Sequence, residues 1–371
     1  MSDKKIAILV AGLPPIYNGG TEIATVSIAQ YAAKQGHDVH VVALDGTNQG
    51  ETAYSIKGVQ IHRVRTISAP YLYGMAATPG IISAIKQIKP DIIHTQGTQM
   101  ALSAYIASKI TGIPYMLYGR GEIYMQWFLK RPLSVFLMSH AERVIAQTQN
   151  MRNEMLKYVQ RDIEVIPNGI DISRFGDMTQ EKARVILNLP RKNGSRGIPE
   201  RGSEIIMSVG KFRQEKNVGL FLKIAAIDLR NPQRTYISVG GGKEFTDIVE
   251  LSNRLKSGVV FSGEVNNSDI PIYMAAADVL VNTSYSEGFP MTILEAYAAG
   301  LPVVCPKITG LSEIVRQGVN GFLYESNNEY SAMQAIDHIM NHSDIRQQIG
   351  QSNKEKSKQY SWDNVVRRLY G

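Results

Sequence analysis

The sequence of 371 residues contains a single cysteine, Cys305, which excludes an internal disulfide. So little cysteine is typical of proteins that work in a reducing cytosol. Cys305 follows two valines, and this pattern indicates a small buried side chain rather than a nucleophile. We therefore expect a cytoplasmic protein whose chemistry does not depend on a thiol.

Long apolar runs are also missing. No stretch of about 18 apolar residues occurs, which is the length that a membrane-spanning helix needs. The apolar run after Lys4 and Lys5 ends at Ala11, too early for a secretory signal, so a soluble protein is expected. Peripheral membrane contact is a separate hypothesis. Residues 127–131 mix aromatic and basic side chains as an interfacial segment does, although a buried helix has the same pattern.

The charge balance is mildly basic, with a formal net charge of +7. Up to residue 170 there are 16 Lys and Arg against 11 Asp and Glu, and after it 24 against 22, so the excess lies mainly in the first half. Such a balance suggests an anionic partner, either nucleic acid or an anionic membrane surface. The net charge of +7 is equally consistent with a mildly basic protein that has no anionic partner.

Apolar segments alternate with helical ones along the chain, and its length exceeds that of a single core. The predicted fold class is α/β, with two doubly wound Rossmann-like domains facing across a cleft, because continuous apolar strands between helices indicate covered parallel sheets. The predicted domains are residues 1–168, joined by a final helix at about 358–371, and residues 169–357. Residues 190–202 predict a surface loop. The expected strands are 6–11, 39–44, 91–95, 115–118, 143–146, 205–209, 235–239, 259–261, 279–282 and 303–305.

The most informative segment is SEGFPMTILEAYAAG at residues 286–300. Pro290 suits the first helical position and Gly300 the position just after the helix, which places Glu287 in the preceding loop and Glu295 in the second turn. Free N–H groups at the start of such a helix can hold a diphosphate. The flanking carboxylates suit the hydroxyls of a sugar and a ribose, so the segment predicts a nucleotide-sugar site.

A glycosidase would use paired carboxylates differently. Helical geometry separates Glu287 from Glu295 by roughly 12 Å. Retaining hydrolases need about 5 Å and inverting ones at most about 9.5 Å. The two acids are therefore interpreted as contacts to different parts of one extended ligand.

Two glycine-rich loops follow predicted strands. Gly19 and Gly20 would let the backbone approach a phosphate or sugar at the start of a helix, although a plain turn fits this loop equally well. Gly241 lies in a run of three glycines, where a tight turn is the stronger interpretation and support of a nucleobase is the alternative. Neither loop has the G-x-G-x-x-G spacing of a dinucleotide site, which disfavours an oxidoreductase.

Charged side chains follow two further strands. Lys211, directly after Gly210, and Lys216 are candidates to neutralise a departing diphosphate, although most lysines are simply solvated. Arg120 and Glu122 follow another strand, where they either hold a charged ligand or pair with each other.

His94 ends a predicted strand and is interpreted as a packed or capping residue rather than a catalyst. No group of His, Cys and Asp in the sequence has the spacing of metal ligands, and no Asp-x-Asp pair occurs. We expect neither a metal nor a cofactor.

Together these segments resemble the family-4 retaining glycosyltransferases with the GT-B fold, formerly called group 1. The resemblance covers nearly the whole chain, and residues 286–300 with their LPVV tail are its most specific part. It also rests on the early double glycine, PDIIH at 90–94, VIPNGID at 165–171, GLSEIV at 310–315 and YSWD at 360–363. The last motif resembles the family's final helix, which crosses back onto the first domain.

The resemblance implies roles for the candidates. Glu287 would bind hydroxyls of the donor sugar, Glu295 the ribose, and the two lysines the diphosphate. The implied catalytic residues are Glu287, Lys211 and Lys216, and the implied donor-binding residues are Gly19, Gly20, Gly210, Gly241, Gly288, Phe289, Pro290, Met291 and Glu295. Sugar or acceptor contact falls to His94, Arg120 and Glu122.

The implied activity is metal-independent transfer of a hexosyl group, with retention, from a UDP-, GDP- or ADP-linked sugar to a glycan or lipid-linked acceptor. Nucleic acid is not an expected partner. The alternatives are a nucleotide-sugar epimerase or another GT-B enzyme, and a non-catalytic sugar-binding protein. Three residues depart from the family pattern. Lys211 stands where arginine is common, Arg120 where many members have a sugar-contacting histidine, and Pro290 where glycine is frequent.

Overall fold

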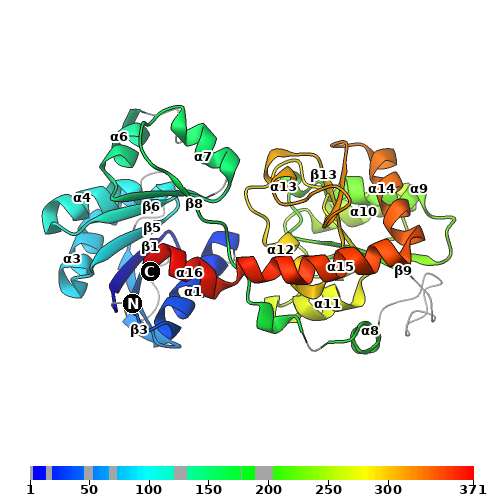
Figure 1. Ribbon diagram of the computed structural model, residues 1–371, viewed down its shortest axis with the longest axis horizontal. Helices are drawn as coiled ribbons and strands as arrows, with labels where there is room; N and C mark the ends of the chain where they lie inside the picture. Colours follow the sequence, from blue (N-terminus) through cyan, green and yellow to red (C-terminus); the bar gives the residue numbers. More distant parts are fainter. Residues whose placement is uncertain are drawn as a thin grey trace. The chain divides into compact units, whose positions relative to one another are not determined.

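The computed structural model describes residues 3–13, 19–45, 53–66, 73–120, 132–176, 178–188 and 204–371. The chain divides into two compact units. Unit 1 comprises Met1–Gly169 and Trp362–Gly371, and unit 2 comprises Ile170–Ser361. Each unit contains one sheet with helices packed against it (Figure 1).

The sheet of unit 1 has eight strands in the order β3-β4-β2-β1-β5-β6-β7-β8. Neighbouring strands are parallel except β3 and β4, which form an antiparallel hairpin. The strands are β1 (Lys5–Val10), β2 (Asp38–Asp45), β3 (Ala53–Ile56), β4 (Val59–Arg65), β5 (Ile92–Gln96), β6 (Tyr115–Tyr118), β7 (Arg143–Ala146) and β8 (Glu164–Val165).

Helices cover both faces of this sheet. In β1, side chains that alternate between the two faces, such as Ile8 and Leu9, are fully buried. Helix α1 packs on β1 and β2 and lies beside α16 from the far end of the chain (Figure 1). The helical segments are α1 (Gly20–Lys34), α2 (Tyr73–Ala76), α3 (Thr78–Ile88), η1 (Thr98–Met100), α4 (Ala101–Thr111), α6 (Pro132–His140), α7 (Gln149–Leu156) and α16 (Trp362–Tyr370).

Unit 2 contains a parallel six-stranded sheet in the order β11-β10-β9-β12-β13-β14. Two apolar clusters lie on its opposite faces, and β9 contributes Met207 to one and Ile206 to the other. The strands are β9 (Glu204–Val209), β10 (Arg234–Val239), β11 (Val260–Gly263), β12 (Val279–Val281), β13 (Val303–Pro306) and β14 (Gly321–Tyr324). The helical segments are η2 (Ile172–Arg174), α8 (Gln180–Leu187), η3 (Gln214–Lys216), α9 (Val218–Ile227), α10 (Phe245–Leu255), η4 (Asn267–Asp269), α11 (Ile270–Ala276), α12 (Met291–Ala299), α13 (Thr309–Ser312), α14 (Glu329–Asn341), α15 (Ser343–Ser357) and η5 (Lys358–Tyr360).

The strand orders locate where ligands bind in such sheets. In unit 2, β9 lies between β10 and β12, and in unit 1, β1 lies between β2 and β5. In each sheet, the chain connections on the two sides of the central strand, β9 or β1, therefore run in opposite directions. Such a reversal opens a crevice beyond the carboxyl ends of the strands. The predicted α/β fold class is confirmed, whereas β3, β4, β8 and β14 were not predicted.

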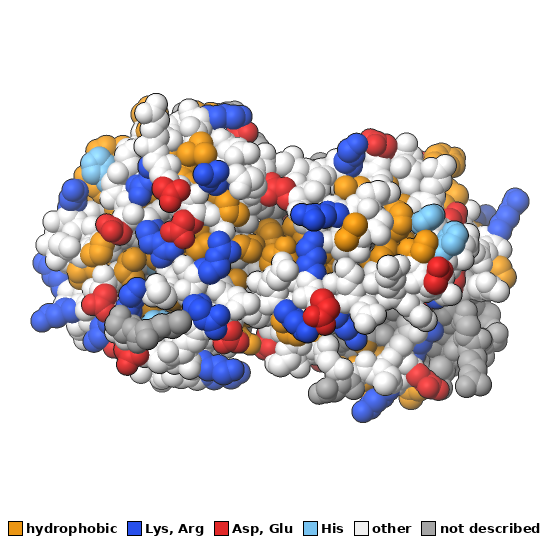
Figure 2. Space-filling view, in the orientation of Figure 1, with side chains coloured by type: hydrophobic (Ala, Val, Ile, Leu, Met, Phe, Trp, Pro, Cys, Tyr) orange, Lys and Arg blue, Asp and Glu red, His pale blue; other side chains and the backbone are white. Residues whose placement is uncertain are grey.

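The described helices and the surface charges concern the hypotheses of membrane contact and of an anionic partner. None of the described helices is both long enough and apolar enough to cross a membrane. On the face shown in Figure 2, basic and acidic side chains are interspersed over each unit. The proposed interfacial segment at 127–131 and the proposed loop at 190–202 lie outside the described residues.

Candidate functional site

The helix predicted from residues 286–300 is α12, which begins at Met291. Pro290 is the capping residue with φ −74° and ψ 121°, so its prediction as the first helical residue was wrong by one position, because its ψ is extended. Gly300 ends the helix in the left-handed conformation at φ 73°, as expected. The N–H groups of the first turn of α12 therefore lie next to the loop that carries Glu287.

Glu287 lies at the centre of a polar cluster in unit 2. Its Oε1 accepts hydrogen bonds from Lys216 Nζ at 2.6 Å, from Ser284 Oγ at 2.6 Å and from Asn282 Nδ2 at 3.3 Å. The side chain is 8% exposed, so it is held in one place. Among the described residues, Oε2 has no hydrogen-bond partner. That oxygen is available to accept a further hydrogen bond.

Glu295 lies in the second turn of α12, as predicted, and is largely buried. Burial raises the pKa of its carboxyl to about 7, and the charge of Arg174 opposes this shift. Among the described residues, Glu295 has neither a hydrogen bond nor an ion pair. Its carboxylate therefore lacks the compensation that buried charges usually have, and hydroxyl donors from a ligand would supply it.

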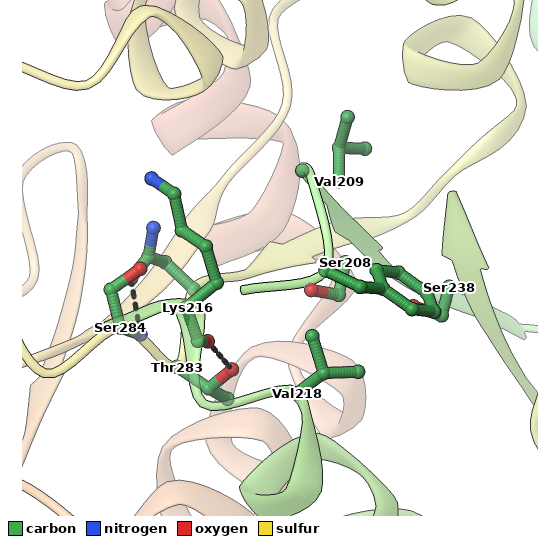
Figure 3. A pocket seen from close by; sticks show the side chains of 10 residues that line it. Ser208, Val209, Lys216, Val218, Ser238, Thr283 and Ser284 are labelled. Atoms are coloured by element: carbon green, nitrogen blue, oxygen red, sulfur yellow. Dashed lines mark hydrogen bonds between the residues drawn. The ribbon is translucent and has the colours of Figure 1, made fainter. Parts of the chain in front are cut away.

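A pocket lies at the switch point between β9 and β12. Figure 3 shows Lys216 and Ser284 on one side of this pocket and Ser208 and Ser238 on the other. Thr283 fixes the loop of Lys216 by donating from Oγ1 to the Lys216 carbonyl at 3.1 Å. The lining residues are Ser208, Val209, Gly210, Phe212, Lys216, Val218, Ser238, Asn282, Thr283 and Ser284. The pocket thus contains one cation and several neutral polar groups, a set that suits a phosphorylated ligand.

The two predicted lysines differ in their surroundings. Lys216 is about one-third exposed and is paired with Glu287, whereas Lys211 is exposed and has no hydrogen bond or ion pair among the described residues. Lys211 lies outside the lining of the pocket. Of the two lysines, only Lys216 is therefore held in place at the pocket.

The triple glycine forms a packed backbone contact with the loop after β9. At Gly240, where φ is 135°, a Cβ would lie 2.0 Å from the Gly210 carbonyl oxygen, and at Gly242, where φ is 143°, 2.8 Å from the Phe212 carbonyl oxygen. The Gly241 carbonyl accepts from the Phe212 N–H at 2.7 Å. These glycines therefore allow close backbone approach, which agrees with the tight-turn interpretation.

Asn282, Ser284 and Gly310 had no predicted role at the site, although Gly310 begins the GLSEIV motif. A Cβ on Gly310 would lie 2.1 Å from the Glu287 carbonyl oxygen, so this glycine lets α13 pack against the Glu287 loop. The available signal for the two polar residues was their position directly after the apolar strand β12. Ligand-facing residues follow such strands in parallel sheets.

In unit 1, Arg120 lies just beyond β6 and is 5% exposed. It donates from Nε to Gln96 Oε1 and from Nη1 to Asn168 Oδ1, the latter at 2.6 Å. Asn168 Oδ1 also accepts from Gln147 Nε2 at 3.0 Å. Glu122 lies outside the described residues. Sequence reasoning found Arg120 but not the amide side chains that hold it.

His94 is fully buried in β5. Its Nδ1 lies 2.5 Å from the hydroxyl of Tyr370, and its Nε2 lies 2.9 Å from Gln96 Nε2. Burial holds the pKa of His94 well below its usual value, so the ring is neutral at physiological pH. The packed-residue interpretation accounts for both nitrogens.

Gly19 and Gly20 lie at the start of α1. Gly19 is the capping residue in an extended conformation, and a Cβ there would lie 2.3 Å from the flexible end of Glu22. At Gly20 a Cβ would meet open space. Neither glycine has the positive φ that demands this residue type.

Comparisons with known proteins cover both units. A family model described as "Glycosyl transferases group 1" matches residues 192–356, and one described as "Glycosyltransferase Family 4" matches residues 18–174. The Escherichia coli UDP-Gal:alpha-D-GlcNAc-diphosphoundecaprenol alpha-1,3-galactosyltransferase is 25% identical over 356 residues, which span 90% of this chain and 87% of that protein.

Solved structures share the fold. Sucrose-phosphate synthase from Thermosynechococcus elongatus has a TM-score of 0.84 at 18% identity, covering 99% of this chain and 97% of that one. Anabaena HepE, solved with UDP and glucose, has a TM-score of 0.76 at 21% identity, covering 99% of this chain and 98% of that one. The chain therefore belongs to the group 1, or family 4, glycosyltransferases and has their GT-B fold.

Proposed function

We propose that this glycosyltransferase moves a hexosyl group from a nucleoside-diphosphate sugar to a hydroxyl of a glycan or lipid-linked acceptor, with retention and without a metal ion. The observation that carries the proposal is the 2.6 Å contact between Lys216 and Glu287 beside the start of α12. A fixed cation and the helical N–H groups at the start of α12 suit the diphosphate of such a donor, and a fixed carboxylate suits the hydroxyls of its sugar.

Unit 2 would bind the donor. The diphosphate would lie against the first-turn N–H groups of α12 and Lys216, with Lys211 moving in from the surface. Glu287 Oε2 would accept from a sugar hydroxyl, and Glu295 from the ribose. The E. coli relative named for UDP-Gal and the HepE complex with UDP and glucose support a nucleotide-sugar donor.

The transfer step breaks the bond between the anomeric carbon and the β-phosphate oxygen. The acceptor oxygen forms the new bond on the same face of the sugar, and its proton passes to the departing phosphate oxygen. Negative charge grows on that phosphate as the bond breaks. Lys216 and Lys211 stabilise this charge without any metal, which is the largest electrostatic task of the reaction.

Unit 1 would bind the acceptor. Its polar side chains lie at the carboxyl ends of β5 and β6, where ligands bind in sheets of this type. The E. coli relative, whose name gives a diphosphoundecaprenol-linked acceptor, supports a lipid-linked glycan as one acceptor class. Under this assignment unit 2 holds the nucleotide of the donor and unit 1 holds the acceptor.

The test begins with binding. Thermal shifts of the full chain with UDP-, GDP- and ADP-linked hexoses identify the donor. Release of free nucleoside diphosphate is then measured with and without neutral and lipid-linked acceptors, and proton NMR of the product gives its anomeric configuration. We expect acceptor-dependent release and a retained configuration.

The alternatives give different results. Conversion of the donor sugar without an acceptor would indicate an epimerase. Saturable sugar binding with no release under any condition would indicate a binding protein. An inverted product would contradict the proposed front-face step while leaving transferase activity in place.

A further inference from the structure

A row of polar side chains lies at the carboxyl edge of the sheet in unit 1. Gln96 is the last residue of β5, Arg120 follows β6 by two residues, Gln147 follows β7 directly, and Asn168 follows β8 by three. Because these strands are parallel neighbours, all four residues meet at one edge. Their hydrogen bonds join them into one network with Arg120 as its only cation.

Among the described residues, Arg120 lacks the carboxylate partners that the other buried arginine, Arg234, has. Arg234 in unit 2 is equally buried, at 4% against 5% exposed. It pairs with the carboxylates of Glu204, Asp228 and Asp337. Among the described residues, Arg120 instead contacts two neutral amide oxygens and has no ion pair. Burial accordingly lowers the pKa of Arg120, whereas carboxylate contacts raise that of Arg234.

The guanidinium group of Arg120 is held in a fixed orientation. Gln96 and Asn168 bind Nε and Nη1, and the Cζ atom lies 4.4 Å from the centre of the Tyr118 ring. The remaining nitrogen, Nη2, is enclosed and has no hydrogen-bond partner in the described part of the chain. A buried donor without a partner is unfavourable, and a charged one more so, unless a ligand completes it.

We propose that Arg120 is a specificity residue that binds an anionic oxygen group, a carboxylate or phosphate, carried by one of the two substrates. The group would bond to Nη2 and to the second hydrogen of Nη1, in the bidentate arrangement that guanidinium groups form with such anions. The free energy of these charge-assisted bonds would compensate for the loss of the contacts that now cover Nη2. This inference rests on the proposed transferase function.

The anionic group has two sources. A uronic-acid donor carries it on the sugar, and a diphosphate-linked acceptor carries it on the acceptor. Both present planar or tetrahedral anionic oxygens of the same chemistry, so the structure assigns the class and the experiment assigns the source.

Two acidic residues of the chain are alternative partners that would neutralise Arg120 in place of a substrate. Glu22 lies in the first turn of α1, and its negative charge opposes the lowering of the Arg120 pKa. Among the described residues, however, Glu22 and Arg120 form no ion pair. Glu122, two residues along the chain, is the partner that the sequence suggests. If Glu122 neutralised Arg120, removing either side chain would have the same effect on substrate selection.

The experiment uses the full chain and two matched pairs of substrates. The donor arm compares the binding of UDP-glucuronate and UDP-glucose by calorimetry without acceptor. If the donor screen selects another nucleoside diphosphate, the same two sugars are compared as its derivatives. The acceptor arm compares decyl diphosphate-linked N-acetylglucosamine with decyl N-acetylglucosaminide by turnover. The variants are Arg120→Gln, Arg120→Lys and Glu122→Gln, with Lys86→Gln of the exposed face of α3 as the control for charge.

We expect the wild-type chain to prefer the anionic member of one pair by tenfold or more, in Kd for the donor arm or kcat/KM for the acceptor arm. Arg120→Gln should bring that ratio to within twofold of one, while Glu122→Gln and Lys86→Gln keep it. Arg120→Lys keeps the charge but loses the bidentate geometry of the guanidinium group, so it should give an intermediate ratio. If Arg120→Gln does not fold, Arg120→Lys alone provides the test.

Equal use of both members in both arms by an active wild type would overturn the inference and leave the transferase function standing. So would an unchanged ratio in the Arg120 variants, or equal loss of the ratio in Glu122→Gln. A wild type that turns over no donor at all would instead contradict the proposed function itself.

Discussion

Lys216 and Glu287, which are 71 residues apart in the sequence, meet through a 2.6 Å hydrogen bond from Nζ to Oε1. Asn282 and Ser284 donate to the same oxygen. One carboxylate oxygen thus accepts three hydrogen bonds from the protein, and the other has no hydrogen-bond partner among the described residues. These hydrogen bonds hold the carboxylate and the ammonium group in a defined mutual arrangement, as the proposed donor site requires.

Replacement of Lys216 by alanine should lower turnover about a hundredfold or more, because the growing charge on the leaving phosphate loses a fixed cation. It should also lower the free energy of unfolding by about 1–3 kcal/mol, since the buried Glu287 loses a donor. Steady-state kinetics and urea unfolding measure the two effects. The control is Lys223→Ala on the exposed side of α9, which should change neither. Near-normal turnover in Lys216→Ala would count against the assignment.

Glu295→Gln should also reduce turnover about a hundredfold, because a neutral amide holds the ribose hydroxyls less strongly than a carboxylate. The variant should nevertheless be more stable than the wild type at alkaline pH. Loss of turnover together with a gain in stability separates a ligand contact from a structural role.

The pH dependence of this effect follows from the raised pKa of Glu295, about 7 in the folded chain against 4.5 as the ordinary value. Between these two values the folded state binds more protons than the unfolded state, so stability falls as pH rises through this window. The cost reaches about 3 kcal/mol above pH 7 and is absent below the ordinary value. Denaturant unfolding at pH 5 and pH 8 should show the gain of Glu295→Gln mainly at pH 8. An equal gain at both values would contradict the burial account.

Gly310→Ala tests the contact that positions the Glu287 loop. Its Cβ would lie 2.1 Å from the Glu287 carbonyl oxygen and 2.7 Å from that of Gly288, so the loop must shift. We expect kcat/KM to fall at least about tenfold and stability by about 1–3 kcal/mol, as overpacking commonly costs. Gly176→Ala is the matched control, because its Cβ would meet open space. Wild-type kinetics in Gly310→Ala would show that the loop position is not required.

Removal of divalent cations should leave the rate unchanged within about twofold, because the proposal assigns charge neutralisation to Lys216 and Lys211. Initial rates in EDTA, and again after addition of excess magnesium, provide the measurement. A fall of tenfold or more that magnesium restores would mean that a metal performs part of this task.

Much of the fold was predictable from the sequence because apolar strands carry a local signal. The bounds predicted for β6 and β7 match the structure. The β3–β4 hairpin was missed because its turn uses Lys57 and Gly58, both with positive φ, and lysine is a weak signal for that conformation. The short β8 and β14 depend on pairing with neighbours rather than on their own composition.

The site was predictable only in part, for a similar reason. Glu287, Glu295 and the start of α12 follow from one continuous segment. The partners of Glu287 come from η3 and from the loop after β12. Which polar residues of that loop reach Glu287 depends on how the loop packs against the loop of Lys216. Gly310 acts through a tertiary contact that no local pattern reveals.

A crystal structure of the full chain with its nucleoside diphosphate tests the central claim most directly. We predict that the diphosphate lies against the first-turn N–H groups of α12, with Lys216 Nζ within hydrogen-bond distance of a phosphate oxygen and Glu295 on the ribose. A nucleotide bound elsewhere, with the start of α12 unoccupied and Glu295 still turned inward without a ligand contact, would contradict the account.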